Sequence, residues 1–199
     1  MTPGGANATT TFQGKTVKAK YTYWTAGDDP EEGAGWYLDA DEDGETNQNA
    51  VLLPLGQGFL VSRNASETEA QLVYSGGVST DPVTRGFVSG YNLVANCSPT
   101  DITLGDITPN ASFSLSSIQF MTPGGANATT TFQGKTVKAK YTYWTAGDDP
   151  EEGPGWYLDA DEDGEVNQND LVTIPAGAGF LVSRNASEGD ASLTIPSAL

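Results

Sequence analysis

The stretch GKTVKAKYTYWT (residues 14–25) decides the fold class, because its side chains alternate in character with a period of two. One face of the extended chain carries Val17, Ala19, Tyr21 and Tyr23. The opposite face carries Lys18, Lys20, Thr22 and Trp24. Alternation of this kind predicts a β-strand with one face in a core, and it does not fit a helix.

The rest of the chain has the same β-rich character. Thr, Val, Tyr and Ser dominate most segments, 24 Gly and 11 Pro mark many turns, and no segment sustains a period of 3.6 residues. We therefore predict an all-β protein with tandem β-sandwich-like domains, or partly open barrels, built from short strands and long acidic loops.

The charge balance excludes two classes of partner. The 199 residues include 26 Asp and Glu but only 9 Lys and Arg, which gives a net charge of −17. Nucleic acid and anionic membrane surfaces both require a basic footprint, so we expect neither as a partner. No apolar run approaches the ~20 residues that span a bilayer, so we expect no membrane insertion. Cations are the partners that suit this balance.

An internal duplication organises the sequence. Residues 1–33 recur unchanged as residues 121–153, and the match continues through GWYLDADEDGE and NQN. Residues 81–120 occur once, between the copies. We therefore predict a first repeat at residues 1–80 that lacks its leading strands. The second repeat, residues 81–199, is complete, with 81–120 as its leading segment and 121–199 as the duplicate of 1–80.

Further strands are predicted from local patterns. GFLVSR (58–63) and AQLVYSG (70–76) have strand composition in the first copy, and GFLVSR recurs at 179–184 in the second. GFVSGYNLVAN (86–96) is typical of a hairpin with Ser89 and Gly90 at its turn. In each copy these strands surround the acidic loop DADEDGE.

The acidic loops have the spacing of a calcium site. In D-x-D-x-D-G, carboxylates at positions 1, 3 and 5 precede a glycine that allows the loop to wrap around an ion, and Ca²⁺ prefers six to eight oxygen ligands. The candidate ligands of the first loop are Asp39, Asp41, Asp43, Glu45 and Asn47. Those of the second loop are Asp159, Asp161, Asp163, Glu165, Asn167 and Asp170. We expect the second loop to bind Ca²⁺ more tightly, because the first has Ala50 where the second has Asp170.

The flanks of these loops leave an alternative open. An EF-hand has helices on both sides and a bidentate Glu at position 12, whereas GWYL and VLLP are typical of strands. The calcium hypothesis is therefore an EF-hand-like loop in a β setting. The alternative is a solvated acidic hairpin that binds no ion.

Tryptophans beside the acidic segment GDDPEEG suggest a second function. Trp24 and Trp36 flank this segment in the first copy, and Trp144 and Trp156 flank it in the second. Aromatic faces that stack on sugar rings, next to carboxylates that bind hydroxyls, would make a carbohydrate-binding module. The alternative is that these rings belong to the core.

Catalysis is not expected. The chain has no histidine, which excludes Ser-His-Asp and Cys-His arrangements. Its single cysteine, Cys97, cannot form an internal disulfide and is expected to be a small buried side chain. N-x-S/T triplets at six positions would make this a glycoprotein in a host that modifies them: Asn7, Asn64, Asn96, Asn110, Asn127 and Asn185.

Residues 81–199 resemble a β-rich repeat domain of secreted and cell-surface bacterial proteins. The resemblance rests on GYNLVANCSPTDITLGDI (90–107), followed by YTYW, GWY and IPAGAGFLV (174–182). Cys97 stands where that family has proline. The resemblance implies export, an extracellular or cell-surface location and a compact β-sandwich-like fold without known catalysis.

Together these patterns predict a calcium-stabilised, non-catalytic structural module of an adhesin or filament. Its partners would be neighbouring repeats or other copies of itself. A first repeat without leading strands would leave an open edge, which strands from another chain could complete.

Overall fold

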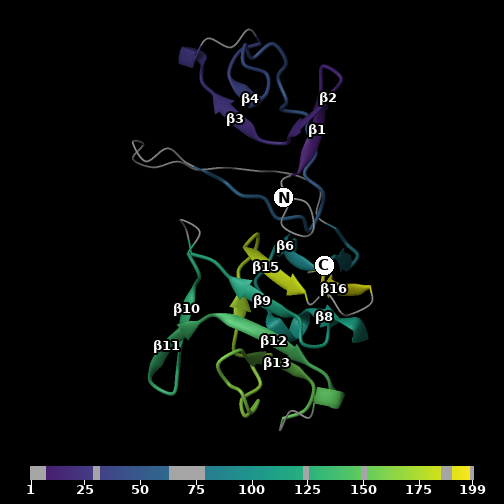
Figure 1. Ribbon diagram of the computed structural model, residues 1–199, viewed down its shortest axis with the longest axis vertical. Coiled ribbons are helices and arrows are strands. Elements are labelled where there is room, and N and C mark those ends of the chain that lie inside the picture. The colour runs from purple at the N-terminus through teal and green to yellow at the C-terminus, as the bar shows by residue number, and fades with distance from the viewer. Residues whose placement is uncertain are drawn as a thin grey trace. The chain divides into compact units, whose positions relative to one another are not determined.

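The computed structural model describes residues 8–28, 32–62, 79–122, 126–148, 152–184 and 190–197. All regular elements in these ranges are strands or short 3-10 helices, so the predicted all-β class is confirmed. Two compact units divide the chain, Ala6–Pro54 with Met1–Thr2 and Leu55–Leu199 with Pro3–Gly5 (Figure 1). Within the described ranges, no helix has the length and apolar character needed to cross a bilayer.

The first unit consists of two hairpins. β1 (Thr9–Phe12) pairs with β2 (Lys15–Lys18), and β3 (Tyr21–Trp24) pairs with β4 (Gly35–Leu38), both antiparallel. A 3-10 turn, η1 (Ala26–Asp28), follows β3. The single strand expected across residues 15–25 is therefore divided at Ala19 and Lys20, because the chain leaves one partner strand there and joins another.

The second unit contains an antiparallel five-stranded sheet. Its order is β13-β12-β9-β15-β6, so β9 is central and β13 and β6 lie at the two ends. Its strands are β6 (Gly90–Ala95), β9 (Ser117–Phe120), β12 (Lys140–Trp144), β13 (Gly155–Leu158) and β15 (Gly179–Arg184). β15 confirms the strand predicted from GFLVSR in the second copy.

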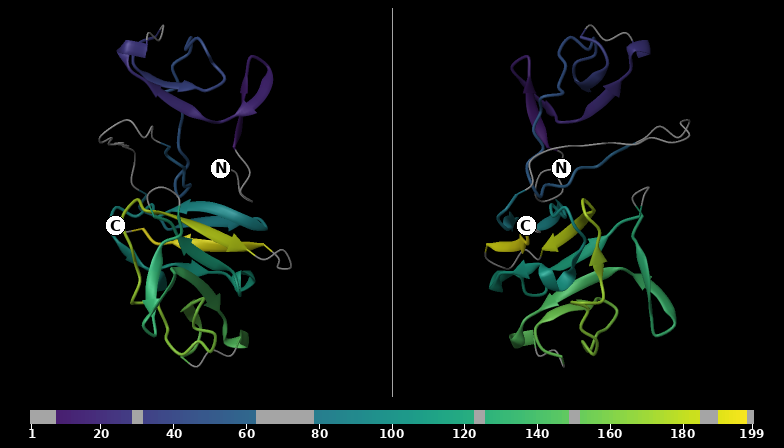
Figure 2. Two further views of the ribbon diagram at one scale, coloured as in Figure 1. Left: turned by 60° about the vertical axis from the view of Figure 1, so that its left-hand side comes forward. Right: turned by 180° about the vertical axis from the view of Figure 1, so that it is seen from behind.

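A smaller sheet packs in the same unit. β16 (Ala191–Ile195) lies between β5 (Val83–Phe87) and β8 (Thr108–Pro109). β7 (Ile102–Thr103) pairs with β14 (Thr173–Ile174). The hairpin of β10 (Thr129–Phe132) and β11 (Lys135–Lys138) projects from these sheets, as the views in Figures 1 and 2 show. The 3-10 turns are η2 (Leu104–Asp106), η3 (Ala111–Phe113) and η4 (Ala146–Asp148).

One hydrophobic core joins the two sheets of the second unit. The large sheet contributes Val94, Ile118, Tyr141, Phe180 and Val182. The small sheet contributes Phe87, Ala191, Leu193 and Ile195. Burial of each large apolar side chain stabilises the fold by roughly 1.5–3 kcal/mol. None of the sheets in the described residues closes into a barrel, and two of them pack around one core, so the second unit is sandwich-like.

The hairpin predicted around Ser89 and Gly90 is wrong. The chain does turn there, but β5 pairs with β16 in the small sheet and β6 pairs with β15 in the large one. The turn therefore connects the two layers of the sandwich. Local alternation identified both strands but could not identify their partners, which are more than 80 residues away in the sequence.

The end of the first copy lies with the second unit. Residues 58–62 form no assigned strand, unlike their duplicate β15. Gln57 instead forms an isolated bridge with Val94, on β6. For this reason the boundary between the compact units falls after Pro54, whereas the duplication suggests a boundary after Thr80. The strand predicted at residues 70–76 lies outside the described residues.

Candidate functional site

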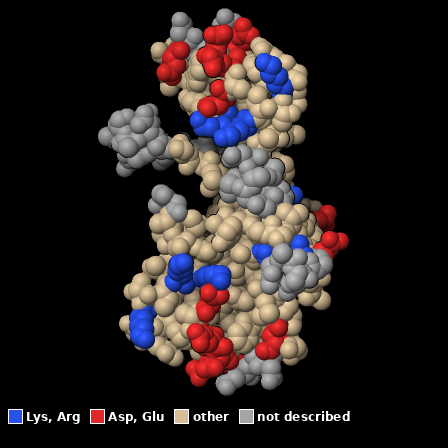
Figure 3. Space-filling model, viewed as in Figure 1, with Lys and Arg blue, Asp and Glu red and all other residues tan. Residues whose placement is uncertain are grey.

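The two acidic loops follow equivalent strands. Asp39 comes directly after β4, and Asp159 comes directly after β13. Asp and Glu side chains gather in patches within each unit, beside a few Lys and Arg side chains (Figure 3). Because the two loops share their sequence up to residues 45 and 165, each contact in one loop can be checked against the other.

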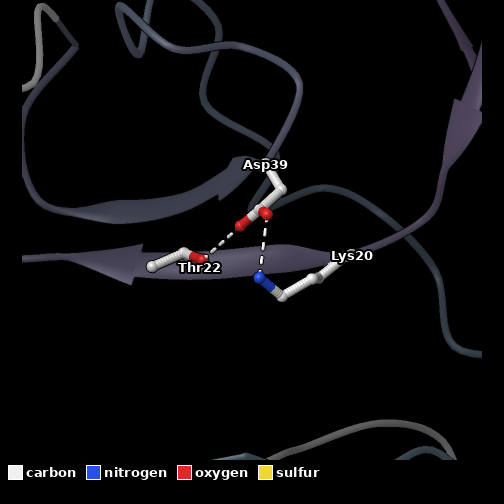
Figure 4. Close-up of polar contacts among 3 residues, drawn as sticks. All are labelled: Lys20, Thr22 and Asp39. Carbon is white, nitrogen blue, oxygen red and sulfur yellow. Dashed lines mark hydrogen bonds and ion pairs between the residues drawn. The ribbon is translucent and has the colours of Figure 1, made fainter. Parts of the chain in front are cut away.

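Asp39 binds a lysine and a threonine from the neighbouring strand region (Figure 4). Lys20 Nζ donates to Asp39 Oδ2 at 2.8 Å, and Thr22 Oγ1 donates to Oδ1 at 2.7 Å. These two hydrogen bonds, that from Lys20 first, lower the pKa of Asp39. In the second copy, Lys140 Nζ donates to Asp159 at 2.8 Å and Thr142 Oγ1 donates at 3.0 Å.

Asp41 is buried and closes the loop from inside. Its side chain is 4% exposed, and it accepts backbone N–H groups from Glu45 at 3.2 Å and Thr46 at 3.0 Å. Asp161 is equally buried and accepts the N–H groups of Glu165 and Val166 at the same distances. The central carboxylate of each loop therefore satisfies backbone donors that burial would otherwise leave without partners.

The glycine of the D-x-D-x-D-G pattern has a packing role. Gly44 has φ of +64° and Gly164 has φ of +65°, values that side chains disfavour. A Cβ on Gly164 would lie 2.7 Å from the ring of Trp144, and one on Gly44 would lie 2.6 Å from the ring of Trp24. The tryptophan ring therefore lies directly against the loop backbone in both copies.

Asn47 anchors the far side of the first loop. Its Oδ1 accepts the N–H of Asn49 at 2.8 Å, and its own N–H donates to Glu32 Oε2 at 2.7 Å. Asn49 Oδ1 in turn accepts the N–H of Trp36 at 3.0 Å. Asn167, Asn169 and Glu152 repeat these contacts in the second copy. Glu32 and Asn49 were missed in the sequence, although the unchanged NQN triplet was a signal for the asparagine.

The remaining predicted ligands lie at the surface. Asp43, Glu45, Asp163, Glu165 and Asp170 are exposed. Asp170 and Asn167 line the same open depression, which Asp159, Asp161 and Asp163 do not line. Across the described ranges, no three Asp, Glu or Cys side chains converge closely enough to hold a metal ion. An ion with six to eight oxygen ligands would therefore require the exposed carboxylates to move toward Asp41 or Asp161.

The tryptophans of the second copy belong to packed clusters. Trp156 is 1% exposed, and its ring meets Phe113 at 5.7 Å and Tyr143 at 5.2 Å between centroids. Trp144 packs on Tyr157 at 5.2 Å. Trp156 therefore offers no free face to a sugar ring. Trp36 is only half-buried, beside Tyr23, which is 53% exposed.

Asn96 connects two motifs that are far apart in the sequence. It is 2% exposed, and its Nδ2 donates to the carbonyls of Thr100, Ile174 and Pro175 at 3.1 Å each. Its Oδ1 accepts the N–H of Ser98 at 2.9 Å. The asparagine after YNLVA and the Ile-Pro pair therefore form one structural unit.

Comparisons with known proteins give this geometry no further context, since no family model, no curated protein and no solved structure matches the chain.

Proposed function

We propose that this chain is a non-catalytic structural repeat module of a secreted or cell-surface protein, with calcium bound at its acidic loops. One observation supports the structural role most directly. The two copies build the same loop with the same contacts. A lysine donates to Asp39 and to Asp159, and a tryptophan ring packs against Gly44 and Gly164. These residues serve the architecture of the loop, as expected for a repeated building block.

The chemistry of the side chains supports a non-catalytic role. The sequence has no histidine to act as a base. Cys97 is half-buried, and burial raises the pKa of its thiol, the opposite of what a nucleophile needs. The location outside the cell is proposed from the family pattern in residues 90–107 and 174–182.

Calcium is proposed because several oxygens remain available at the surface of each loop. A carboxylate has about four lone-pair sites, and the backbone N–H groups occupy only part of those on Asp41 and Asp161. Exposed Asp43 and Asp163 lie two residues further on. Such an ion would neutralise charge in a chain of net charge −17 and hold the loop closed.

Thermal unfolding tests the calcium part of the proposal. Calcium at ~100 times its dissociation constant should stabilise the folded state by about 2.7 kcal/mol, which raises Tm by several degrees. Calorimetry compares the Tm of the chain in about 5 mM CaCl₂ with its Tm in EDTA. Replacing Asp43 and Asp163 by Asn should remove the difference, whereas Mg²⁺ should reproduce little of it. Equal Tm values for the natural chain in both buffers would reject calcium binding.

A carbohydrate-binding module is the second candidate, and one observation favours it. In the first copy, Tyr23 is 53% exposed and its ring lies 5.4 Å from that of half-buried Trp36. Two partly exposed rings beside acidic residues could stack on a sugar. Titration with oligosaccharides should then change the tryptophan fluorescence of the chain and not that of a Trp36→Ala variant.

A further inference from the structure

The two copies form the same hairpins, but only the second copy is built into a larger sheet. β3 pairs with β4 with Tyr21 opposite Leu38, and β12 pairs with β13 with Tyr141 opposite Leu158. β12 also pairs with β9, where Tyr141 lies opposite Ile118. Among the described strands, β3 pairs with β4 alone. The first copy therefore already has the local structure that the second copy presents to β9.

The sequences of these hairpins are nearly interchangeable. Residues 1–49 and 121–169 differ only at Ala34/Pro154 and Thr46/Val166. β6 and β9 belong to residues 81–120, which lie between the two copies. Each copy therefore borders these strands directly, the first copy before them in the chain and the second copy after them.

In the fold, the second copy ends where residues 81–120 begin. Ile195 of β16 lies opposite Val83 of β5, and Ser197 Oγ donates to the Thr80 carbonyl at 2.9 Å. Folds in which the two ends of the chain lie close together tolerate circular permutation. A copy that precedes Thr80 in the chain can therefore occupy the same place in the fold as a copy that follows residue 120.

β6 already contacts both copies within the second unit. Phe180 of β15 lies opposite Val94 at one edge of β6, and Gln57 forms its bridge with Val94 at the other edge. The Ala95 N–H donates to the Gly56 carbonyl at 3.2 Å beside this bridge. Gln57 directly precedes the sequence GFLVSR of the first copy, which forms β15 in the second copy. The first copy of the β15 sequence therefore begins beside the strand with which β15 pairs.

We propose that residues 81–120 form the same sandwich with either neighbouring copy, so that the chain exchanges between two folded isomers. In the observed isomer, the second copy completes the sandwich, and Val182 lies opposite Ile118. In the exchanged isomer, the first copy takes its place, with Val61 opposite Ile118, and the product is a circular permutation of the observed unit. Positions that differ between the copies set the balance. This inference goes beyond the proposed function, since it holds with or without calcium and in any location.

A single substitution in the second copy tests the proposal in the full chain. Val182 is 0% exposed, so Val182→Asp places a carboxylate in the core of the observed isomer, and the first copy should replace the second. Mass spectrometry then follows hydrogen exchange in each copy. Amides in residues 34–46 should exchange at least ~10-fold more slowly than in the natural chain, and those in 154–166 at least ~10-fold faster. Amides in β6 and β9 should stay protected, because both strands remain in a sandwich.

Val61→Asp is the matched control, because Val61 is 62% exposed in the observed isomer. Alone, this substitution should leave the hydrogen exchange of β6 and β9 unchanged. Combined with Val182→Asp, it leaves neither copy able to cover Ile118, and amides in β6 and β9 should exchange at least ~10-fold faster than in Val182→Asp. The proposal is wrong if Val182→Asp alone loses the protection of β6 and β9 as fully as the double variant, or if residues 154–166 remain better protected than residues 34–46.

Disulfide trapping detects the exchanged isomer without a substitution in the core. Gln119 lies opposite Lys140 in the observed isomer, and Lys20 is the duplicate of Lys140. In a Cys97→Ser background, Gln119→Cys with Lys20→Cys should form a disulfide within single chains under mild oxidation. Gln119→Cys with Lys15→Cys is the control and should form its disulfide at least ~10-fold more slowly. A disulfide between positions 20 and 119 that forms only in dimers, as judged by sedimentation, or no faster than the control, would overturn the proposal.

Discussion

Gly44 and Gly164 each meet two physical requirements at once. Their backbones have φ of +64° and +65°, and each lies under the ring of a tryptophan from the preceding hairpin. Trp24 and Trp144 are in turn packed on Tyr37 and Tyr157, with centroids 5.3 Å and 5.2 Å apart. The conformation of the acidic loop therefore depends on the packing of the tryptophan ring on its tyrosine.

Replacing Gly164 by alanine should destabilise the second unit. The left-handed backbone disfavours a Cβ by about 1–2 kcal/mol, and contact with the Trp144 ring at 2.7 Å adds to the cost. We expect a total loss of about 2 kcal/mol or more in urea unfolding. Gly147→Ala is the control, because its nearest neighbour is Thr145 Oγ1 at an ordinary 3.7 Å. Equal stability of the two variants would contradict this packing role.

Asp148 and Asp28 hold equivalent 3-10 turns with different numbers of hydrogen bonds. Asp148 Oδ2 accepts Thr145 N and Thr145 Oγ1, and also Ser114 Oγ, each at 2.7 Å. Asp28 accepts only the two Thr25 groups, at 2.7 and 2.9 Å, among the described residues. Burial acts to raise the pKa of Asp148, but its hydrogen bonds to Thr145 and Ser114 outweigh this and lower it.

This lowered pKa predicts a loss of stability in acid. The folded pKa of Asp148 lies below the unfolded value of 3.8, so its ionised form stabilises the fold above that pH. The contribution is lost as the pH falls through the folded pKa. Asp148→Asn should therefore destabilise the chain at pH 7 and flatten its pH dependence in acid, measured by urea unfolding from about pH 7 to 2. Asp28→Asn is the control and should have the smaller effect on stability, because Asp28 accepts no serine hydroxyl among the described residues. An Asp148→Asn variant whose stability depends on acid pH as that of the natural chain does would contradict the prediction.

At the scale of elements, the same strand contributes differently in the two copies. β15 lies between β6 and β9, and Ile174 just before it is fully buried. Residues 58–62 have the same sequence but no assigned strand, and Leu53 is 58% exposed. Stability in these segments is therefore set by the covering strands and not by the local sequence.

A pair of truncations should measure this difference directly. Ile174→Ala should destabilise the chain by about 2–5 kcal/mol, because it leaves a cavity in a filled core. Leu53→Ala removes a mostly exposed side chain and should change stability by about 0.5 kcal/mol or less. Chemical denaturation of both variants provides the comparison. Similar losses would mean that Leu53 is buried in solution.

Sequence patterns predicted the elements better than their partners. Alternation in residues 14–25 identified the strands, but the break at Ala19 depends on where β1 and β4 lie. Spacing likewise selected Asp39 and Asp41 as ligands, yet it could not show that Lys20 reaches Asp39 from across the sheet. Pairings of this kind depend on long-range packing, which local periodicity does not contain.

At the scale of the whole molecule, one complete sandwich-like unit and one smaller unit share a chain. The second unit, Leu55–Leu199, has buried side chains from two sheets. The first unit, Ala6–Pro54, has two hairpins and, among its described residues, only a few fully buried side chains, such as Tyr37 and Leu38. Because apolar burial is the main stabilising term, the first unit should open more readily.

Hydrogen exchange should reveal this difference within one sample. Peptides that cover residues 34–46 and 154–166 can be distinguished by mass, because they differ at Ala34/Pro154 and Thr46/Val166. We expect amides in 154–166 to exchange at least ~10-fold more slowly, since β13 belongs to the five-stranded sheet. Equal protection of the two peptides in mass spectrometry would contradict the prediction that the first unit opens more readily.

The buried carboxamide of Asn96 affects how the chain could be matured. Asn96, Cys97 and Ser98 form an acceptor triplet for oligosaccharide transfer, but the Nδ2 that would receive the sugar already donates to three carbonyls. A transferase could reach this nitrogen only while the chain is still unfolded, and the attached glycan would then prevent the turn from closing onto Ile174 and Pro175. Modification and folding therefore exclude one another at this asparagine, whichever cell makes the protein.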